Sequence, residues 1–219
     1  MKAVVRAACA ALFVVPFLLP TSRACAQVTA TAPETLPPSY NNRWDIYGGF
    51  QYSHFNPGLG RNVAATNLYG WNGTATIYLR PLWGIEMGYR GLHGDMTVPA
   101  NPFGVPPSPR MSENLVLFGP TFRILRRDNW AAGLHVLVGS TYGDFDKDFP
   151  SGVQPNSVGI YNDKLAFAGA VGAWFDYSLS PKLSVRVITD YQPTHYGYGT
   201  QSEFAGSAGI VYKLGSLTK

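Results

Sequence analysis

The sequence predicts an all-β protein, an eight-stranded antiparallel up-and-down transmembrane β-barrel, from three observations. From Trp44 onward, apolar residues alternate with small or polar ones at a period of two, and this pattern recurs eight times. The links between the repeats alternate between short and long. After the N-terminal segment, no apolar run reaches the roughly eighteen residues of a membrane helix, so a chain that spans a membrane must do so as a closed barrel.

The first 26 residues have the features of a secretory signal peptide. Lys2 and Arg6 form a basic start, an apolar stretch follows, and an A-x-A site ends at Ala26, so we expect cleavage after Ala26. Both cysteines, Cys9 and Cys25, would leave with this segment, which excludes a disulfide framework. A lipoprotein with Cys25 as its lipid-bearing residue is an alternative, which the arginine two positions earlier disfavours.

Cleavage would nearly balance the charge of the remaining chain. The sequence has 17 Lys and Arg against 13 Asp and Glu, and three of the basic residues precede the cleavage site. No cluster of Lys and Arg remains on any one element, so we expect no nucleic-acid partner. Residues 27–43 are rich in Pro, Thr and Ala and lack periodicity, which predicts a disordered lead, and residues 215–219 form a short tail.

Each repeat of the alternation predicts one strand. One set of side chains is large and apolar and the other is smaller and more polar, as expected for a wall with lipid on its outer face and polar side chains on its inner face. The segments have about ten to fourteen residues, longer than most soluble strands and long enough to cross a bilayer at a tilt. The predicted strands are 44–55, 67–80, 83–95, 112–124, 130–142, 164–177, 182–191 and 203–214. Pro120 cannot donate to a strand ladder, so we expect it at an edge or a bulge.

The lengths of the links support the same architecture. Links at 81–82, 125–129 and 178–181 are short, whereas those at 56–66, 96–111, 143–163 and 192–202 are long and rich in Gly, Pro, Asn and Asp. Short turns at one end and long loops at the other are typical of outer-membrane barrels. With an even number of strands, the N-terminus and the C-terminus of the chain both lie on the short-turn side, which we expect to face the periplasm.

The last predicted strand carries a further pattern. Ser207, Gly209, Tyr212 and Leu214 form polar-x-Gly-x-x-aromatic-x-apolar, which resembles the C-terminal assembly signal of bacterial outer-membrane barrels. The Gly-x-x-aromatic-x-apolar part recurs at 119–124 and 172–177. Five residues follow Leu214, whereas the family often ends on an aromatic residue.

Over residues 44–214 the chain resembles the small eight-stranded outer-membrane barrels of the OmpA/OmpX type. The resemblance implies a protein of the Gram-negative cell envelope, located in the outer membrane and inserted there by the barrel assembly machinery. Outer-membrane lipids and lipopolysaccharide are then its expected partners, and we expect a monomer.

Charged residues on the inward-facing set are the candidate functional site. The interior of an eight-stranded barrel is just wide enough for its side chains, and buried charges must pair. We therefore interpret this lumen charge network as a salt-bridged filling of the barrel, with a narrow gated channel for ions or small solutes as the alternative. The network consists of Glu86, Arg90, Arg123, Arg186 and Asp190.

Two further groups invite a metal or surface interpretation. Asp144, Asp146 and Asp148 have the alternate spacing of carboxylates in a calcium loop. The segment lacks the glycine and the distal glutamate of such a loop, so we expect a solvated loop there. Three histidines, His54, His93 and His195, are expected at surface or aromatic-girdle positions.

The remaining alternatives concern catalysis and solubility. A lipid A-modifying enzyme would use His with Ser and an acidic partner, but His195, Ser202 and Glu203 lack the close His-x-Ser spacing of those enzymes. A secreted soluble barrel would place its apolar set inside and its polar set outside, and we disfavour it because the set opposite the large apolar side chains is too small and too polar to make a soluble core. We therefore expect no catalytic site, no metal and no cofactor, and a role in envelope integrity or in surface binding through the loops.

Overall fold

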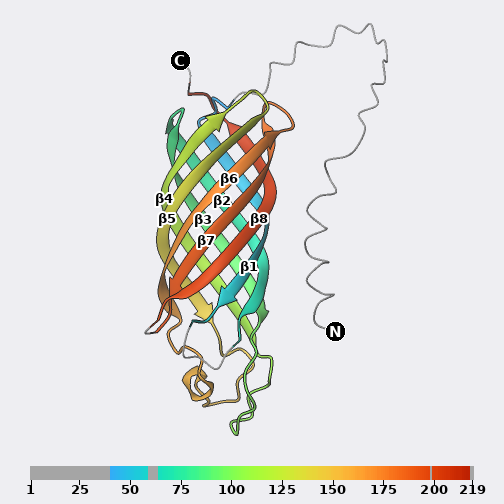
Figure 1. Ribbon diagram of the computed structural model, residues 1–219, viewed down its shortest axis with the longest axis vertical. Helices are drawn as coiled ribbons and strands as arrows, with labels where there is room; N and C mark the ends of the chain where they lie inside the picture. The colour runs from blue at the N-terminus through green and yellow to red at the C-terminus, as the bar shows by residue number, and fades with distance from the viewer. Residues whose placement is uncertain (1–39, 59–63, 198, 218–219) are drawn as a thin grey trace, which may run out of the picture. The chain divides into compact units, whose positions relative to one another are not determined.

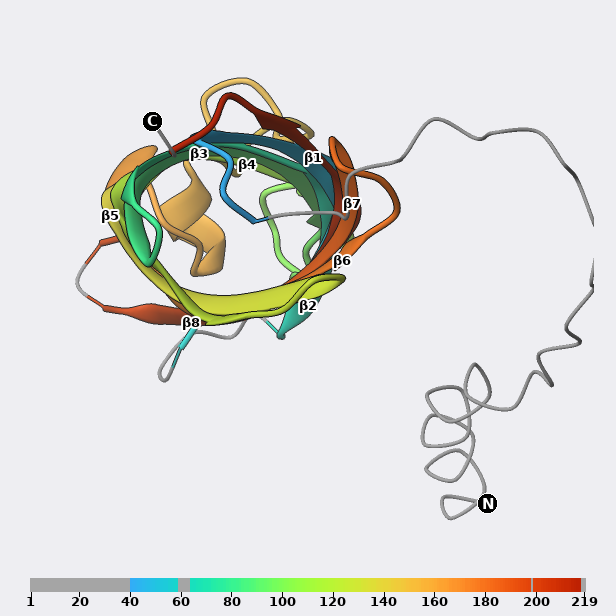
Figure 2. The same cartoon turned by 90° about the horizontal axis from the view of Figure 1, so that it is seen from above.

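The computed structural model describes residues 40–58, 64–197 and 199–217 and shows a closed barrel of eight strands (Figure 1). Every strand pairs antiparallel with its neighbours in sequence, and the first pairs with the last. Seen from above, the strands form a ring (Figure 2). They are β1 (Trp44–Asn56), β2 (Thr66–Arg80), β3 (Trp83–Asp95), β4 (Arg110–Arg126), β5 (Trp130–Asp144), β6 (Leu165–Ser178), β7 (Leu183–His195) and β8 (Gln201–Leu214). The predicted fold class is confirmed.

The links divide between the two ends of the barrel as predicted. Links of two to four residues lie at one end, here called the short-turn end, at 81–82, 127–129 and 179–182. The opposite, long-loop end carries the links at 57–65, 96–109, 145–164 and 196–200, and a short 3-10 helix, η2 (Pro155–Val158), lies in the third of them. No helix in the described part of the chain is long and apolar enough to span a membrane.

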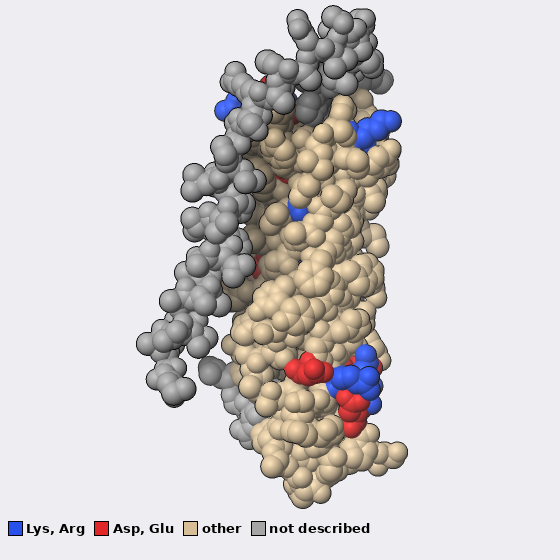
Figure 3. Space-filling view, turned by 90° about the vertical axis from the view of Figure 1, so that its right-hand side faces the viewer, with Lys and Arg blue, Asp and Glu red and all other residues tan. Residues whose placement is uncertain are grey.

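Between its two ends, the wall of the barrel is apolar outside and carries its charges inside, and on the face in Figure 3 the larger groups of Lys, Arg, Asp and Glu lie toward the two ends. Phe50 and Phe118 are 59% and 58% exposed, whereas the side chains of Arg90 and Arg123 are completely buried. This arrangement follows from the alternation, because successive side chains of a strand point to opposite faces. Aromatic residues frame the apolar belt at both ends: Trp44, Trp83, Tyr177 and Tyr212 at the short-turn end, and Tyr52, Tyr69, Tyr142 and Tyr191 at the other.

Pro120 corrects one sequence-based expectation. It lies inside β4, opposite Ile85 of β3, and the register between β4 and β5 is the same before and after it. The register of β4 with β5 shifts only later, between Arg123 and Leu125. A closed barrel has no edge strand to offer, and the missing N–H of one proline removes a single ladder bond while leaving the pairing intact.

The interior is less uniformly polar than the sequence suggested. At the long-loop end, inward-facing residues pack into an apolar cluster that also takes in loop residues, here called the outer plug. Its wall residues include Phe55, Leu68, Leu92, Met111, Leu115, Leu117 and Leu137, and its loop residues include Met96, Val98, Val105, Phe145, Val158, Ile160 and Tyr161. The outer plug therefore joins the loops to the barrel by hydrophobic burial.

Candidate functional site: the charged lumen

Four charged residues near the short-turn end form what we call the basal network, Asp45, Asp176, Arg123 and Arg186. The Arg186 guanidinium donates to both carboxylates, at 2.6 Å from Nε to Asp176 Oδ1 and 2.7 Å from Nη2 to Asp45 Oδ2. Arg123 Nη2 lies 3.8 Å from the same Asp45 oxygen. All four side chains are buried, and two cations balance two anions, so the desolvation cost of each charge is offset within the network.

Aromatic rings complete the surroundings of the two arginines. The Arg123 guanidinium lies 3.8 Å from the centroid of the Tyr78 ring, and that of Arg186 lies 4.7 Å from the Trp174 ring. A guanidinium over an aromatic face gains a cation–π attraction, which is larger where water is excluded. The basal network is therefore held by directional contacts on several sides.

The described end of the N-terminal lead closes the mouth beside this network. Tyr40 and Asn42 are buried, and Arg123 donates hydrogen bonds to the backbone carbonyl of Tyr40 and to Asn42 Oδ1. Ser178 Oγ donates to the Tyr40 hydroxyl at 2.8 Å, and burial raises the pKa of that hydroxyl. Residues 27–39 of the predicted disordered lead lie outside the described residues, whereas Tyr40 and Asn42 are packed in the interior, so the prediction of disorder is wrong for them.

A second group, the central network, consists of Glu86, His135, Asp190 and Arg90. His135 lies between two carboxylates, with Nδ1 3.2 Å from Glu86 Oε1 and Nε2 2.8 Å from Asp190 Oδ1. Arg90 Nη2 pairs with the other oxygen of Asp190 at 2.6 Å. An imidazole can donate from both ring nitrogens only as an imidazolium, so the geometry suits a charged His135 and a balanced group of two cations and two anions.

A third group lies closer to the long-loop end and is not balanced. Glu113 accepts hydrogen bonds from Thr141 and Tyr196, each at 2.9 Å, and Glu203 accepts from Ser53 at 2.7 Å and Gln192 at 2.9 Å. The two carboxyl groups interact with each other. Glu113 Oε2 and Glu203 Oε1 take no hydrogen bond from any other described residue, so we call these residues the outer acid pair.

The structure places all five predicted network residues in the lumen but divides them between two groups. Glu86, Arg90 and Asp190 meet in the central network, while Arg123 and Arg186 meet in the basal one. Sequence reasoning did not include the partners that complete the two groups, Asp45, Asp176 and His135, or the outer acid pair, Glu113 and Glu203. All of these occupy inward positions of the alternation, so the signal for their burial was present.

The three loop aspartates are each engaged by a cation of the chain. Lys164 Nζ lies 2.9 Å from Asp146 Oδ1 and 3.5 Å from Asp144 Oδ1. Arg110 donates to both oxygens of Asp148 at 2.6 to 3.1 Å and lowers the pKa of that carboxyl to about 2. Among the described residues no cluster of three or more His, Cys, Asp or Glu is suited to hold a metal ion.

The residues considered for lipid A chemistry are not assembled into a site. His195 and Ser202 face outward, where His195 Nδ1 contacts Thr200 and Ser202 Oγ contacts Tyr191. Glu203 is turned into the lumen and completely buried. His54 and His93 are also exposed at the long-loop end. A carboxylate on one face of the wall cannot orient a histidine on the other.

The four residues of the predicted assembly pattern lie on both faces of β8. Tyr212 and Leu214 are exposed on the outer wall, whereas Ser207 is buried and donates to the backbone carbonyl of Phe50 at 2.9 Å. At Gly209 an added Cβ would lie 2.1 Å from the Gly48 carbonyl oxygen, so only glycine fits this contact with β1. The role of this pattern in assembly stays a prediction.

Fold and lumen together define a class, the small up-and-down β-barrel with an apolar outer wall and a filled interior. Among solved structures, the chain is similar to Neisserial surface protein A, with 10% identity over 78% of this chain and 97% of that one and a TM-score of 0.54. This similarity supports the predicted resemblance in fold to small eight-stranded barrels.

Two further structures have the same kind of likeness. Ail of Yersinia pestis shares 15% identity over 78% of this chain and 99% of its own, with a TM-score of 0.49. The N-terminal β-barrel domain of Pseudomonas aeruginosa OprF shares 9% identity over 78% and 97%, with a TM-score of 0.44. No protein-family model and no curated protein sequence matches the chain.

Proposed function

We propose that this chain is a non-enzymatic outer-membrane β-barrel protein of a Gram-negative bacterium, which supports envelope integrity or binds partners through its long loops. The observation that carries the proposal is the outer wall, where all eight strands expose large apolar side chains. Soluble monomers rarely expose an apolar patch beyond about 600 Å². A bilayer removes this cost, because lipid chains cover the apolar belt and the aromatic residues frame it at both interfaces.

The route to the membrane follows from the sequence. We propose that the signal peptide is cleaved after Ala26, that the assembly machinery reads the pattern ending at Leu214, and that the protein inserts as a monomer. The short-turn end then faces the periplasm, and the long loops face outward beside lipopolysaccharide. The burial of the charged residues inside the wall, where lipid does not reach them, supports the insertion step of this proposal.

A narrow channel is less well supported than a filled barrel. The side chains of the basal and central networks are at most 2% exposed, and the outer plug packs across the long-loop end. A gate would have to separate these balanced ion pairs, which leaves buried charges without partners. Planar-bilayer recordings test this alternative, and steady single-channel currents that change on Arg186→Gln would support it against the filled barrel.

One loop feature favours surface binding. Phe103 is 46% exposed in the loop between β3 and β4. The side chain of Asn101 organises this tip by bonding the backbone of Pro99, Phe103 and Val105, and Gly104 adopts a φ of 73° there. The loop therefore presents an apolar ring on a locally ordered turn, which suits an interaction surface.

The first experiment is the electrophoretic mobility of the outer-membrane fraction in SDS, with and without boiling. A closed barrel resists SDS until it is heated, so we expect a mobility shift in this fraction. A protein that is found free in the periplasm or medium and shows no shift would overturn the proposed location.

A second experiment separates the two proposed roles. We compare a deletion strain complemented with the wild-type chain, with Phe103→Ser, or with Leu82→Ser, an exposed residue of a short turn as the matched control. If the loop tip binds a partner, Phe103→Ser abolishes surface binding and leaves the mobility shift intact. If resistance to large antibiotics is restored equally by all three, the role in envelope integrity is supported independently of this loop.

A further inference from the structure

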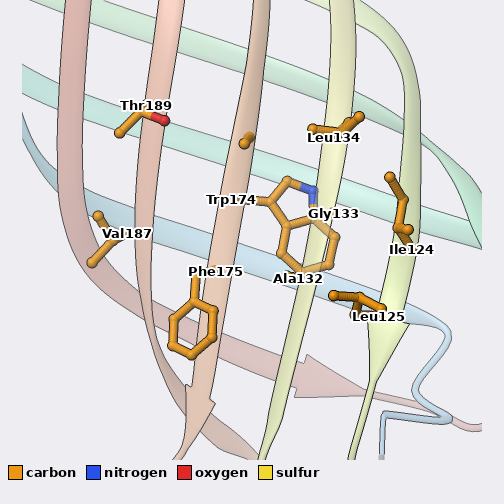
Figure 4. A pocket seen from close by; sticks show the side chains of 10 residues that line it. Ile124, Leu125, Ala132, Gly133, Leu134, Trp174, Phe175, Val187 and Thr189 are labelled. Carbon is orange, nitrogen blue, oxygen red and sulfur yellow. The ribbon is translucent and has the colours of Figure 1, made fainter.

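The apolar belt is interrupted by a groove on the outer wall. The groove has a volume of about 370 Å³ and crosses β4 to β7 near their short-turn ends (Figure 4). Its sides are bulky apolar residues and its floor is made of small residues, with Trp174 beneath. The residues used in the argument are Leu125, Ala132, Gly133, Ala173, Trp174 and Val187.

The floor of the groove is thin for a structural reason. Gly133 of β5 pairs with Trp174 of β6, whose indole points inward and donates from Nε1 to Thr121 Oγ1 at 3.1 Å. The indole lies across the strand at Gly133 (Figure 4), and an added Cβ at that position would lie 2.4 Å from its Cζ2 carbon. Gly133 faces inward, so the indole fills the inner side of the wall there, and the depression on the outer side depends on the small neighbouring outward residues.

Small residues continue the depression on both sides of this point. Ala173 of β6 pairs with Leu134 of β5, and Ala132 of β5 pairs with Phe175 of β6. Each pair sets one large outward side chain against one methyl group. The groove is thus continuous with the apolar belt and lies deeper than the surrounding wall.

Basic residues lie beyond the short-turn end of the groove. Arg126 ends β4, and Arg127 belongs to the turn 127–129 that joins the two strands β4 and β5 lining the groove. Both side chains are exposed, but Arg126 lies opposite the inward Ala131 and its Nη1 contacts Asn41 Oδ1 at 3.0 Å at the lumen mouth. The Arg127 amide donates to the Trp130 carbonyl, and the alternation places Arg127 on the outer face. Between this turn and the groove, the rings of Trp130 and Phe175 stack with centroids 5.8 Å apart. An apolar slot, an aromatic pair and a basic turn thus follow one another along the wall.

We infer that the groove binds one acyl chain of a phospholipid, whose phosphate is held by Arg127. The inference rests on the proposed function, since only a membrane-embedded barrel meets lipid at this face. The volume is at the lower end of the roughly 300–1,000 Å³ of small-molecule sites, and the lining is apolar as such sites require. Guanidinium groups bind phosphate bidentately, which fixes the headgroup at the level of the aromatic pair.

The test uses the full-length mature protein in vesicles of phosphatidylethanolamine and phosphatidylglycerol, with a trace of phosphatidylglycerol that carries a diazirine in its acyl chain. After illumination, mass spectrometry maps the labelled peptides. We expect label on 124–134 and 173–189 several-fold above the rest of the belt. Ala173→Leu should reduce it to the level of the belt, whereas Ala75→Leu, an outward alanine on β2, should leave it unchanged.

The charged part of the site has its own variant. Arg127→Gln should lower labelling of the groove at least threefold without changing labelling of β1 to β3. Arg126→Gln, the matched control at the lumen mouth, should leave labelling of the groove unchanged. The mobility shift in SDS verifies that each variant is folded. Equal labelling of all belt positions, unaffected by Ala173→Leu, would overturn the groove site while leaving the membrane location in place.

Two other outcomes also bear on the inference. Absence of label from the whole belt would contradict the proposed function itself rather than the groove alone. Cross-links that join 124–134 of one copy to the same face of another copy, in place of lipid label, would overturn the lipid site in favour of self-association.

Discussion

The two ends of the lumen are closed by different physical means. At the short-turn end, four charges of the basal network balance one another through short, directional contacts, and aromatic rings lie against the arginines. At the long-loop end, the outer plug excludes water by packing, and the buried carboxyl groups of the outer acid pair lie beside it. The difference shows that one closure depends on geometry and the other on buried area.

The largest effect is expected from the basal network. Arg186→Met leaves Asp45 and Asp176 buried without their main cation, so we expect a loss of about 3–5 kcal/mol in the free energy of unfolding. Urea titration of the protein in lipid vesicles, followed by tryptophan fluorescence, measures it. Arg80→Met removes an exposed arginine and is the control. Adding Asp176→Asn, which leaves Arg123 balanced by Asp45, should recover most of the loss, and failure to recover it would mean that packing rather than charge dominates this end.

The outer plug should respond to lost volume instead. Leu115 is completely buried, and Leu115→Ala should cost about 2–5 kcal/mol through lost burial and the cavity that remains. The same urea titration applies, with the exposed Leu82→Ala as the control. Unlike the first variant, substitution of a basal-network charge should not restore stability. A rescue by Asp176→Asn would show that the two closures are coupled.

The outer acid pair gives a smaller effect of opposite sign. Glu203→Gln replaces one of two facing carboxyl groups by an amide that can donate to Glu113, so unfolding should become harder by about 1 kcal/mol at neutral pH. Glu86→Gln is the matched control, because it breaks a balanced group and should destabilise the barrel. A loss of stability in both variants would indicate that Glu203 has a cationic partner in the folded barrel.

The smallest effect concerns the bridge between Arg110 and Asp148, which joins the base of one long loop to the next. Arg110 lowers the pKa of Asp148 to about 2, so the bridge contributes fully above the ordinary carboxyl value near 3.8 and is lost as the pH falls through about 2. Hydrogen exchange in 145–164, expressed relative to the intrinsic exchange rate at each pH, should therefore rise as the pH falls from 4 to 2. Asp148→Asn should remove this dependence, and Asp163→Asn should not.

The fold could be predicted because its signals are local. Alternation and link length sufficed to locate all eight strands, but some strand ends at the long-loop side differ from the predicted bounds. β7 continues to His195, beyond the predicted end at residue 191, because Gln192 and Thr194 keep facing inward where the outward residues are no longer apolar. The side chains still alternate between the two faces there, but the outward residues are no longer the large apolar ones by which the strand was predicted.

The interior contacts were harder to predict for two reasons. Asp45, Asp176 and His135 stood at inward positions, but which inward residues meet depends on the tilt and stagger of the strands, and the sequence does not state these. The outer plug was hidden for a different reason. In the run Leu115 to Phe118 every residue is apolar, so the residues that face the interior look the same as those that face outward.

The pairing of β1 with β8 also bears on how the chain could be rearranged. Trp44 lies opposite Leu214, and the Leu217 amide donates to the Asn41 carbonyl at 2.8 Å. A short linker between residues 217 and 41 would therefore join the two ends without displacing a strand. A circular permutant opened in the loop 196–200 would keep every pairing of the ring, while moving the strand with the assembly pattern from the last position to the first. Its yield in the membrane would separate what the barrel needs for stability from what the cell needs for insertion.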